Sequence, residues 1–299
     1  MKHLLVLTWI LATVPTISAQ DITTLEKIGD VASLTKTDKS LTLTCKDNSQ
    51  VQLTILAPDL VRVRASFTTP IPTKDHSWAI AKNDWTTPRW SLNESSTAIT
   101  ITTDELEVTI QRSPLLISFR DARTHQLLNA DERPMSYDAS GRLAGMMFDP
   151  QAGKFVAASK KLGFDEHFYG LGEKAARLDK RRSSFANWNS DTPGYFEGRD
   201  PIYQTIPFYV GLQRGIAYGI FFDNSYRSYF DFGKSSQQRA WFGAEGGEMN
   251  YYFFYGPSIK KILGRYADLT ATCPCRRSGR SAINRVAGVI TPTRWLKKW

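Results

Sequence analysis

The chain has 299 residues, of which 41% are hydrophobic and 22% charged, a composition typical of a globular protein with a substantial core. This composition excludes wholesale disorder. Three cysteines are too few for a disulfide framework, and no apolar run beyond the N-terminus reaches the roughly 18 residues of a membrane span. The net charge of +9 does not indicate nucleic-acid binding, because seven basic and no acidic residues lie in 273–299. Removing those seven from the 38 basic residues leaves 31 against 29 acidic residues in 1–272.

The first 19 residues have the layout of a secretory signal peptide. A positive start is followed by a mostly apolar run at 4–14 and by the small residues Ser18 and Ala19. We therefore expect a signal peptide at 1–19 and a secreted or periplasmic protein, with a buried N-terminal strand or helix as the alternative. In an oxidising compartment the single early cysteine, Cys45, is expected to be a buried apolar residue rather than a nucleophile.

Short β-branched or alternating runs, separated by turn clusters, dominate residues 20–255. Residues 60–65 alternate apolar and basic side chains, as expected of a strand with one solvated face. No strand–helix–strand rhythm precedes Gly256, so the sequence predicts an all-β fold, a large antiparallel β-sandwich. The expected strands are 41–44, 51–56, 60–65, 98–102, 106–111, 115–119, 206–212, 217–222, 226–232 and 249–255.

One helix is predicted in residues 256–272, after the last expected strand. Ser258 is suited to cap its N-terminus. Apolar side chains recur at helical spacing on one face, at Ile259, Ile262, Leu263, Tyr266 and Leu269.

Motifs that carry chemistry are few. The four histidines are widely scattered, and no pairing of the HxH, HExxH or CxxC kind predicts a metal site. Gly170-Leu-Gly-Glu173 is half of a phosphate-binding glycine loop, but it lacks the third glycine and a following Lys-Ser/Thr. The basic run between Lys174 and Arg182 is interpreted as a solvated face rather than a nucleic-acid patch. We therefore expect no metal and no cofactor.

A series of ordered motifs between residues 168 and 257 resembles glycoside hydrolase family 31. The motifs are FYGLGE at 168–173, WNSD at 188–191, PIYQTIPF at 201–208, YGIFFDN at 218–224, AEGG at 244–247 and YYFFYGP at 251–257. The resemblance implies an N-terminal sandwich like that of galactose mutarotases, followed by a (β/α)8 barrel. It also implies retaining hydrolysis of α-glycosides, as in α-glucosidases and α-xylosidases, which needs two carboxyl groups about 5 Å apart.

In this family both catalytic aspartates lie near the ends of barrel strands. The sequence stops at the first helix leading towards that barrel, 256–272, so we assign no catalytic residue and expect a truncated hydrolase that is inactive as written. An exposed barrel-facing surface, including part of this helix, would favour self-association. The expected partner is carbohydrate at most, with no nucleic acid and no membrane span.

The resemblance implies one substrate-binding residue. In the family, a sandwich loop leans over the barrel mouth, and an aspartate there hydrogen-bonds the sugar on the leaving-group side. The WNSD motif matches that loop, so the contact would be Asp191; a loop carboxylate with no ligand is the alternative. The remaining motif residues would maintain the sandwich, Gly170 and Gly172 by allowing tight backbone, and Tyr169, Phe208 and Phe221 by filling the core.

Residues 273–299 differ from the rest of the chain in charge and in cysteine content. Cys273-Pro-Cys275 has the wrong spacing for zinc. Shifting the reading frame by one base permits codons that spell Met-Pro-Leu-Pro-Pro-Val-Trp, a string that resembles the family's barrel entry. We therefore interpret 273–299 as an aberrant, frameshifted tail caused by a one-nucleotide deletion near codon 272. A basic tail that binds an anionic polymer is the alternative.

Two other functions fit a secreted sandwich. A self-sufficient carbohydrate-binding or mutarotase-like domain would need its own sugar site, and mutarotation would require a histidine acid/base near a carboxylate. The obvious candidate is His167, beside Glu166 and Asp165. A purely structural sandwich would show no saturable sugar binding.

Overall fold

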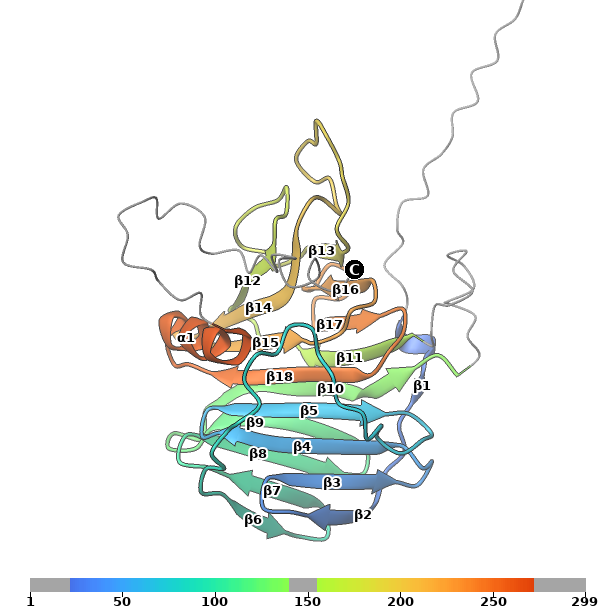
Figure 1. The fold of residues 1–299 in the computed structure, drawn as a ribbon, viewed down its shortest axis with the longest axis vertical. Helices are drawn as coiled ribbons and strands as arrows, with labels where there is room; N and C mark the ends of the chain where they lie inside the picture. Colours follow the sequence, from blue (N-terminus) through green and yellow to red (C-terminus); the bar gives the residue numbers. More distant parts are fainter. Residues whose placement is uncertain (1–21, 140–154, 272–299) are drawn as a thin grey trace, which may run out of the picture.

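Two antiparallel sheets face each other in the computed structural model, which describes residues 22–139 and 155–271 (Figure 1). This arrangement confirms the predicted all-β sandwich. The predictions for the signal peptide at 1–19 and for the tail at 273–299, with Cys273 and Cys275, lie outside the described residues. A short 3-10 turn, η1 (Ile22–Thr24), precedes the first strand.

The first sheet has ten strands: β1 (Glu26–Lys27), β6 (Ser91–Glu94), β7 (Ala98–Thr102), β8 (Leu106–Arg112), β9 (Leu115–Asp121), β10 (Leu127–Tyr137), β11 (Val156–Lys161), β13 (Ser184–Asn187), β16 (Ser228–Asp231) and β17 (Arg239–Ala244). Their order is β13–β16–β17–β11–β10–β9–β8–β7–β6, with β1 paired to β10. Neighbours in the chain pair with one another from β6 to β11, which is the pattern of an up-and-down meander.

The second sheet has eight strands: β2 (Val31–Lys36), β3 (Ser40–Cys45), β4 (Gln50–Ala57), β5 (Leu60–Ser66), β12 (Glu166–Gly172), β14 (Thr205–Gln213), β15 (Ile216–Phe222) and β18 (Met249–Tyr255). Their order is β12–β14–β15–β18–β5–β4–β3–β2. β18 therefore joins the N-terminal strands to β12, β14 and β15. In this way the chain's two halves share one core.

All ten expected strands are present, each within two residues of its expected ends. The pattern misses eight others, among them β10 and β11. β10 contains the polar run Asp131-Glu-Arg133, which breaks the two-residue alternation that marks a strand. Asp131 is nevertheless buried, because Lys160 of β11 lies opposite it and pairs with it. Local pattern alone does not contain this long-range pairing.

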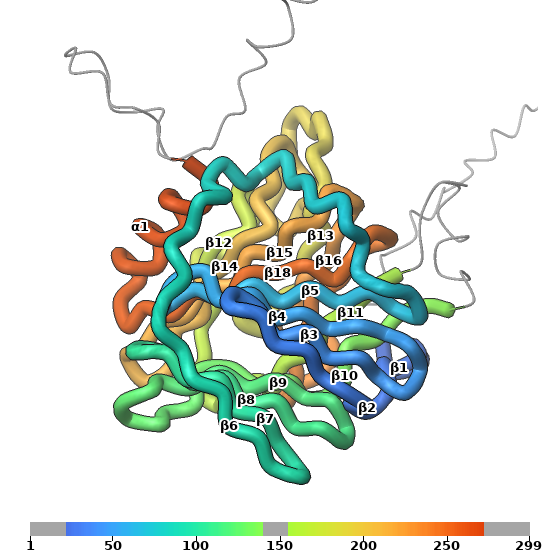
Figure 2. Tube along the Cα trace, turned by 60° about the horizontal axis from the view of Figure 1, so that its bottom comes forward, coloured from blue at the N-terminus to red at the C-terminus, as the bar shows by residue number. Residues whose placement is uncertain are grey.

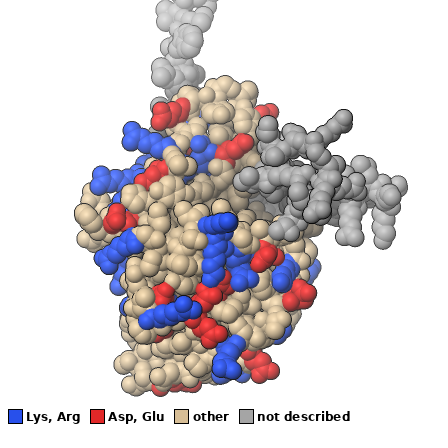
Figure 3. Space-filling model, turned by 90° about the vertical axis from the view of Figure 1, so that its left-hand side faces the viewer, with Lys and Arg blue, Asp and Glu red and all other residues tan. Residues whose placement is uncertain are grey.

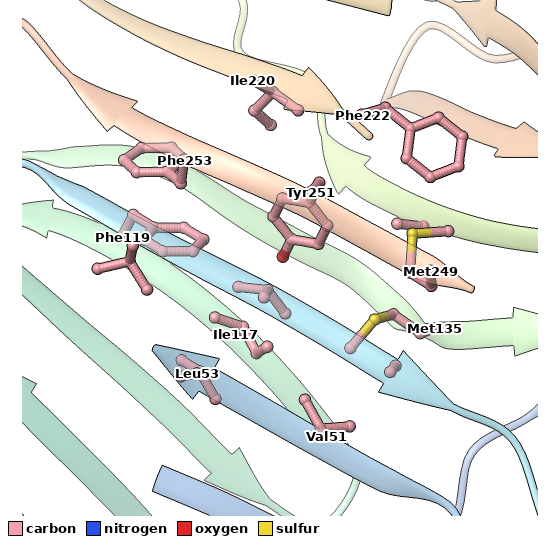
Figure 4. Packing of buried hydrophobic residues seen from close by; sticks show 14 of the residues in the cluster. Val51, Leu53, Ile117, Phe119, Met135, Ile220, Phe222, Met249, Tyr251 and Phe253 are labelled. Carbon is pink, nitrogen blue, oxygen red and sulfur yellow. The ribbon is translucent and has the colours of Figure 1, made fainter. Parts of the chain in front are cut away.

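Side chains from the inner faces of both sheets interdigitate in one core. The ring of Phe119 on β9 stacks on that of Phe253 on β18, with centroids 3.9 Å apart, and Figure 4 shows the two rings side by side. Phe253 also stacks on Tyr218 of β15. Burial of each aromatic side chain contributes roughly 1.5–3 kcal/mol, so these contacts help to hold the sheets together.

The single described helix, α1 (Ile259–Thr270), lies against the outer face of the second sheet (Figure 1). The predicted cap is confirmed, because the Ser258 hydroxyl accepts a hydrogen bond from the Lys261 amide at 3.3 Å. Ile262 and Leu269 are fully buried. A Cβ atom at Gly219 of β15 would lie 2.7 Å from Ile262 Cγ2, so the helix can approach the sheet this closely only over a glycine.

The apolar face of α1 is only partly covered. Of the five predicted face residues, Ile259 is 38% exposed and Leu263 49% exposed, because they lie on the side of the helix turned away from the sheet. The long connection 67–90 crosses the outside of the second sheet and reaches the end of α1, as Figure 2 shows. There the amides of Ala81 and Lys82 donate to the Leu269 carbonyl. This connection thus fixes the C-terminal turn of the helix.

Charges are mixed on the face that carries α1. Figure 3 shows Lys and Arg side chains interspersed with Asp and Glu on this side of the molecule. Such a surface lacks the continuous basic patch that nucleic-acid binding uses. Within residues 22–139 and 155–271, no helix is long and apolar enough to cross a membrane.

Candidate functional site

The candidate substrate contact lies in the longest described connection of the upper part of the sandwich. Residues 188–204 link β13 to β14 and project away from both sheets (Figure 1). Two prolines and two glycines interrupt any regular pattern in this segment. Ordered loops of this length are uncommon in compact domains and are typically functional.

An ion pair anchors the base of this loop. Lys174 Nζ lies 2.8 Å from Asp200 Oδ1 and donates to the Ala186 carbonyl at 2.7 Å. The Lys174 side chain is completely buried, and this desolvation lowers its pKa although Asp200 opposes the effect. The Ala186 amide donates to the other Asp200 oxygen. The loop therefore begins and ends at fixed points.

Hydrogen bonds also brace the loop internally. The side-chain oxygen of Asn189 accepts hydrogen bonds from both the backbone amide and the hydroxyl of Thr205, each at 2.9 Å. The Tyr203 hydroxyl donates to the Thr192 carbonyl at 2.8 Å, directly after the candidate aspartate. A loop held in this way can present a side chain in a defined position.

Asp191 is exposed near the start of the loop. Among the residues that the structure describes, no hydrogen bond or ion pair engages its carboxylate. The two oxygens are therefore available as acceptors for a hydroxyl group that approaches from outside the sandwich.

Exposed aromatic rings surround this carboxylate in the sequence. Tyr195 and Phe196 lie in the loop, with 49% and 70% of their surface exposed, and Trp188 lies at its start. Tyr195 packs edge-on against Tyr203, with ring centroids 5.9 Å apart. The paired rings of Tyr195 and Tyr203, both partly exposed, form an apolar surface of the kind that can contact a ligand or another protein.

The glycine pair of the first motif permits a close strand pairing beside the loop. Gly172 has φ +74°, and a Cβ atom there would lie 2.8 Å from the Gln204 carbonyl oxygen. Gly170 is equally tight against Phe208. The predicted tight backbone is therefore confirmed, and it brings β12 against the end of the loop.

The predicted core positions are confirmed in part. Phe208 and Phe221 are buried, in the cluster between the second sheet and α1. Tyr169 is only half-buried, because strand alternation turns it outward and places Phe168 in the core instead. Cys45 is buried as expected, and this burial raises the pKa of its thiol to about 12.

The solvated-face interpretation of the basic run at 174–182 is wrong for two of its members. Lys174 is buried in the ion pair with Asp200, and Lys180 is 6% exposed and donates to the Arg177 carbonyl at 2.6 Å. Both ammonium groups also lie within 6 Å of the Phe185 ring centroid. Runs of charged residues are usually solvated, but here neighbouring parts of the chain pack over the Lys174 and Lys180 side chains.

Two of the cavities on the described surface lie beside long connections. One lies between β5, β18 and the 67–90 connection, has a volume of about 190 Å³ and includes Arg62 and Asp75. The other lies at the base of the 188–204 loop, has a volume of about 280 Å³ and includes Asn187 and Trp188.

Three polar side chains of the first cavity, those of Arg62, Asp75 and Ser77, already have partners. Arg62 forms two hydrogen bonds to Asp75, at 2.6 and 2.8 Å, and a third to Asn250 at 2.9 Å. Asp223 accepts from Ser77 at 2.7 Å and from Asn250 at 3.1 Å. Although burial is the largest influence and opposes it, the hydrogen bond to Asp75 raises the pKa of Arg62. This network attaches the 67–90 connection to the sheet.

The histidine of the mutarotase alternative lines neither cavity. His167 Nδ1 lies 2.7 Å from Asp179 and Nε2 lies 3.3 Å from Asp165, on the outer face of β12. Glu166 points to the inner face, where it accepts from the Tyr218 hydroxyl at 2.6 Å. Strand alternation therefore separates the two groups that would have to act together. Within the described residues, no cluster of three His, Cys, Asp or Glu side chains could hold a metal ion.

The residues that sequence reasoning missed at this end of the molecule are Asn187 and the Lys174–Asp200 pair. Asn187 immediately precedes the recognised WNSD motif, but nothing in the local sequence indicates that its amide is buried. The pairing of Lys174 with Asp200 joins residues 26 positions apart, which no local pattern contains.

Comparisons with known proteins give consistent results. The family described as the glycosyl hydrolase 31 N-terminal galactose mutarotase-like domain matches residues 50–231. An α-glucosidase of Bacillus thermoamyloliquefaciens is 33% identical over 185 residues, 62% of this chain and 22% of that protein. The α-xylosidase XylQ of Lactiplantibacillus pentosus is 35% identical over 116 residues, 39% of this chain and 14% of that protein.

A solved structure shares the fold. The Flavobacterium johnsoniae GH31 dextranase, whose complexes contain glucose or isomaltotriose, superposes with a TM-score of 0.70 at 30% identity. The superposition covers 82% of this chain and 28% of the dextranase. The chain thus spans between 14% and 28% of the length of these relatives.

Proposed function

The chain belongs to glycoside hydrolase family 31 through its N-terminal galactose mutarotase-like domain, and we propose that this sandwich forms part of the sugar-binding cleft of an enzyme acting on α-glycosides. Within that cleft, the 188–204 loop would lie over the mouth of the (β/α)8 barrel, as the family resemblance implies. Asp191 would accept a hydrogen bond from the sugar on the leaving-group side. No described residue is proposed to be catalytic.

The observation that carries this proposal is the state of Asp191. Its carboxylate is exposed and unpaired among the described residues, yet the loop that carries it is braced by Lys174–Asp200 and by Tyr203. A positioned, unpaired acceptor suits a hydroxylated substrate, because it can select one orientation of a sugar ring.

The substrate class follows from the relatives. Their names specify α-glucosidases, an α-xylosidase and a dextranase, and the dextranase complexes contain glucose or isomaltotriose. We therefore propose α-linked glucosyl or xylosyl oligosaccharides. Secretion remains a prediction based on residues 1–19, and self-association remains a prediction based on the partly exposed face of α1.

A loop graft tests the proposed role of Asp191. Residues 188–204 would replace the matching loop of the Flavobacterium johnsoniae dextranase, with Asp191 or with Asp191→Asn, and kcat/KM for isomaltotriose would be measured. Losing a hydrogen bond to a charged acceptor is expected to lower kcat/KM by about tenfold or more.

The matched control is Glu197→Gln in the same graft. Glu197 is another exposed carboxylate of the loop with no partner among the described residues, so its neutralisation changes charge equally. We expect kcat/KM to remain within about twofold. Equal kcat/KM values for the Asp191→Asn and Glu197→Gln grafts would contradict the proposed contact.

A further inference from the structure

The cavity at the base of the 188–204 loop contains an unsatisfied amide. Asn187, the last residue of β13, is 4% exposed, and neither its Nδ2 nor its Oδ1 atom has a hydrogen-bond partner within the described residues. It is the only described side chain with two such buried atoms. Buried polar groups are nearly always hydrogen-bonded, because leaving them unpaired costs stability.

The same cavity is lined by neutral groups throughout. Asn189, Thr205 and Ser228 contribute amide and hydroxyl groups, and Trp188 and Tyr226 contribute aromatic rings. None of the lining residues is Asp, Glu, Lys, Arg or His. An anionic ligand such as a phosphate, or a cationic one, would therefore find no countercharge in the lining.

Several lining groups besides Asn187 are free to bind. The Asn189 side-chain oxygen is used by Thr205, but no hydrogen bond within the described part of the chain engages its Nδ2 atom. The hydroxyls of Tyr226 and Ser228 are likewise without a partner there. The cavity thus offers both donors and acceptors, a combination that complements hydroxyl groups, since each hydroxyl donates one hydrogen bond and accepts others.

The aromatic wall is held in position. The Arg227 guanidinium carbon lies 5.4 Å from the centroid of the Trp188 ring, although Arg227 does not line the cavity. This cation–π contact supports the indole beside the cavity. A flat, weakly polar ring face next to free amide groups suits a ligand with one apolar face and a hydroxylated edge.

From these observations we propose that the cavity formed around Asn187, Trp188 and Tyr226 is a binding site for one neutral sugar ring, separate from the contact made by Asp191. Its volume of about 280 Å³ accommodates a single ring rather than an oligosaccharide, because it lies just below the roughly 300–1,000 Å³ range of small-molecule pockets. Asp191 does not line it. The choice of carbohydrate rests on the proposed function, whereas the neutral charge and the small size rest on the cavity itself.

Binding of D-glucose and of D-glucuronate to the full chain, measured by saturation-transfer NMR and titration calorimetry, tests this proposal. We expect saturable, millimolar binding of D-glucose and weaker binding of the charged analogue. Asn187→Leu, which keeps the side-chain size and removes both polar atoms, is expected to weaken glucose binding about tenfold or more.

Two further variants keep the result interpretable. Trp188→Ala should also weaken binding, while Trp78→Ala, which removes another exposed tryptophan outside this cavity, should leave it unchanged. Glu197→Gln, which neutralises an exposed carboxylate of the same loop outside this cavity, should bind glucose like the unaltered chain.

Absence of saturable glucose binding by the unaltered chain would overturn the proposal, and so would unchanged binding by both Asn187→Leu and Trp188→Ala. Binding lost in Asp191→Asn but retained in Asn187→Leu would overturn it as well, while leaving the proposed role of Asp191 intact. Conversely, the loop-graft experiment measures hydrolysis rather than glucose affinity. A negative result there would contradict the role of Asp191 but not the proposed sugar site in this cavity.

Discussion

Between the two sheets, Lys160 donates to Asp131 at 2.6 Å and to the Tyr251 hydroxyl at 3.1 Å, whereas at the loop end neither amide atom of Asn187 has a partner in the part of the chain that the structure describes. Both side chains are buried. The comparison shows that burial alone does not explain the unpaired state of Asn187. The interior network pairs its charged groups, whereas Asn187 is the only described side chain in which two buried polar atoms lack a partner. Single buried atoms without a partner also occur within the sandwich, for example Asn129 Oδ1 and Trp241 Nε1.

The interior network is arranged to keep its charges compensated. Although desolvation opposes the effect, the charge of Asp131 raises the pKa of Lys160 to about 12. The second Asp131 oxygen accepts from the Ile117 amide at 2.8 Å. The pair thus joins β9, β10 and β11 to β18 through hydrogen bonds.

The largest effect is expected from breaking this pair. Lys160→Met leaves the Asp131 carboxylate buried without its counterion, which should lower the free energy of unfolding by about 3–5 kcal/mol. The double variant Lys160→Met/Asp131→Asn removes both charges and keeps an acceptor for Ile117, so it should lose less than the single variant. Urea denaturation followed by tryptophan fluorescence measures both. A single-variant loss below about 1 kcal/mol would show that the pair does not contribute as its burial implies.

A smaller loss in the free energy of unfolding is expected when the second interior network is broken. The Tyr218 hydroxyl donates to Glu166 at 2.6 Å and accepts from Asn129 at 3.2 Å, so Tyr218→Phe leaves two buried groups short of a partner. We expect a loss of about 1–3 kcal/mol in urea denaturation.

Tyr203→Phe is the matched control for this change. It removes an exposed hydroxyl whose one partner is the Thr192 carbonyl, which solvent can also reach, so its cost should stay below about 1 kcal/mol. Equal losses in the free energy of unfolding for Tyr218→Phe and Tyr203→Phe would mean that the interior hydrogen bonds stabilise the fold no more than the one in the loop.

The His167–Asp179 pair at the surface of β12 should contribute still less to the free energy of unfolding, and only in part of the pH range. The hydrogen bond to Asp179 raises the pKa of His167, so its stabilisation is complete below the unfolded value of about 6.5 and is lost as pH rises through the folded value. Although desolvation opposes the effect, the hydrogen bond from His167 lowers the pKa of Asp179, whose stabilisation is lost as pH falls below about 4.

His167→Gln should therefore cost at most about 1 kcal/mol near pH 5.5 and less at pH 8, because the pair is partly exposed. Thermal unfolding at the two pH values measures the difference. His76→Gln is the control, since His76 forms no ion pair among the described residues. A cost that is the same at both pH values would exclude the charged form of His167 as its source.

The smallest change, or a gain, is expected at the loop end. Asn187→Leu removes a buried amide that has no partner within 22–139 and 155–271 and replaces it with an apolar group of similar size, so the free energy of unfolding should change by less than about 0.5 kcal/mol or increase. Asn129→Leu, which removes the donor to Tyr218, should be destabilising by comparison. A large loss for Asn187→Leu would show that the amide supports the fold, and the contrast drawn between the two regions would fail.

The sequence by itself determined the sandwich class, ten strands to within two residues, the cap of α1 and the family, because alternation, capping and ordered motifs are local features of the chain. The proposed sugar contact at Asp191 also comes from a sequence motif and stays a prediction. Only the tertiary structure decided that Lys174 and Lys180 are buried and that Asn187 has no partner among the described residues, because each depends on strand pairings and contacts between segments distant in the chain. Burial of a polar side chain depends on which distant segments pack against it, and the local sequence pattern does not contain that information.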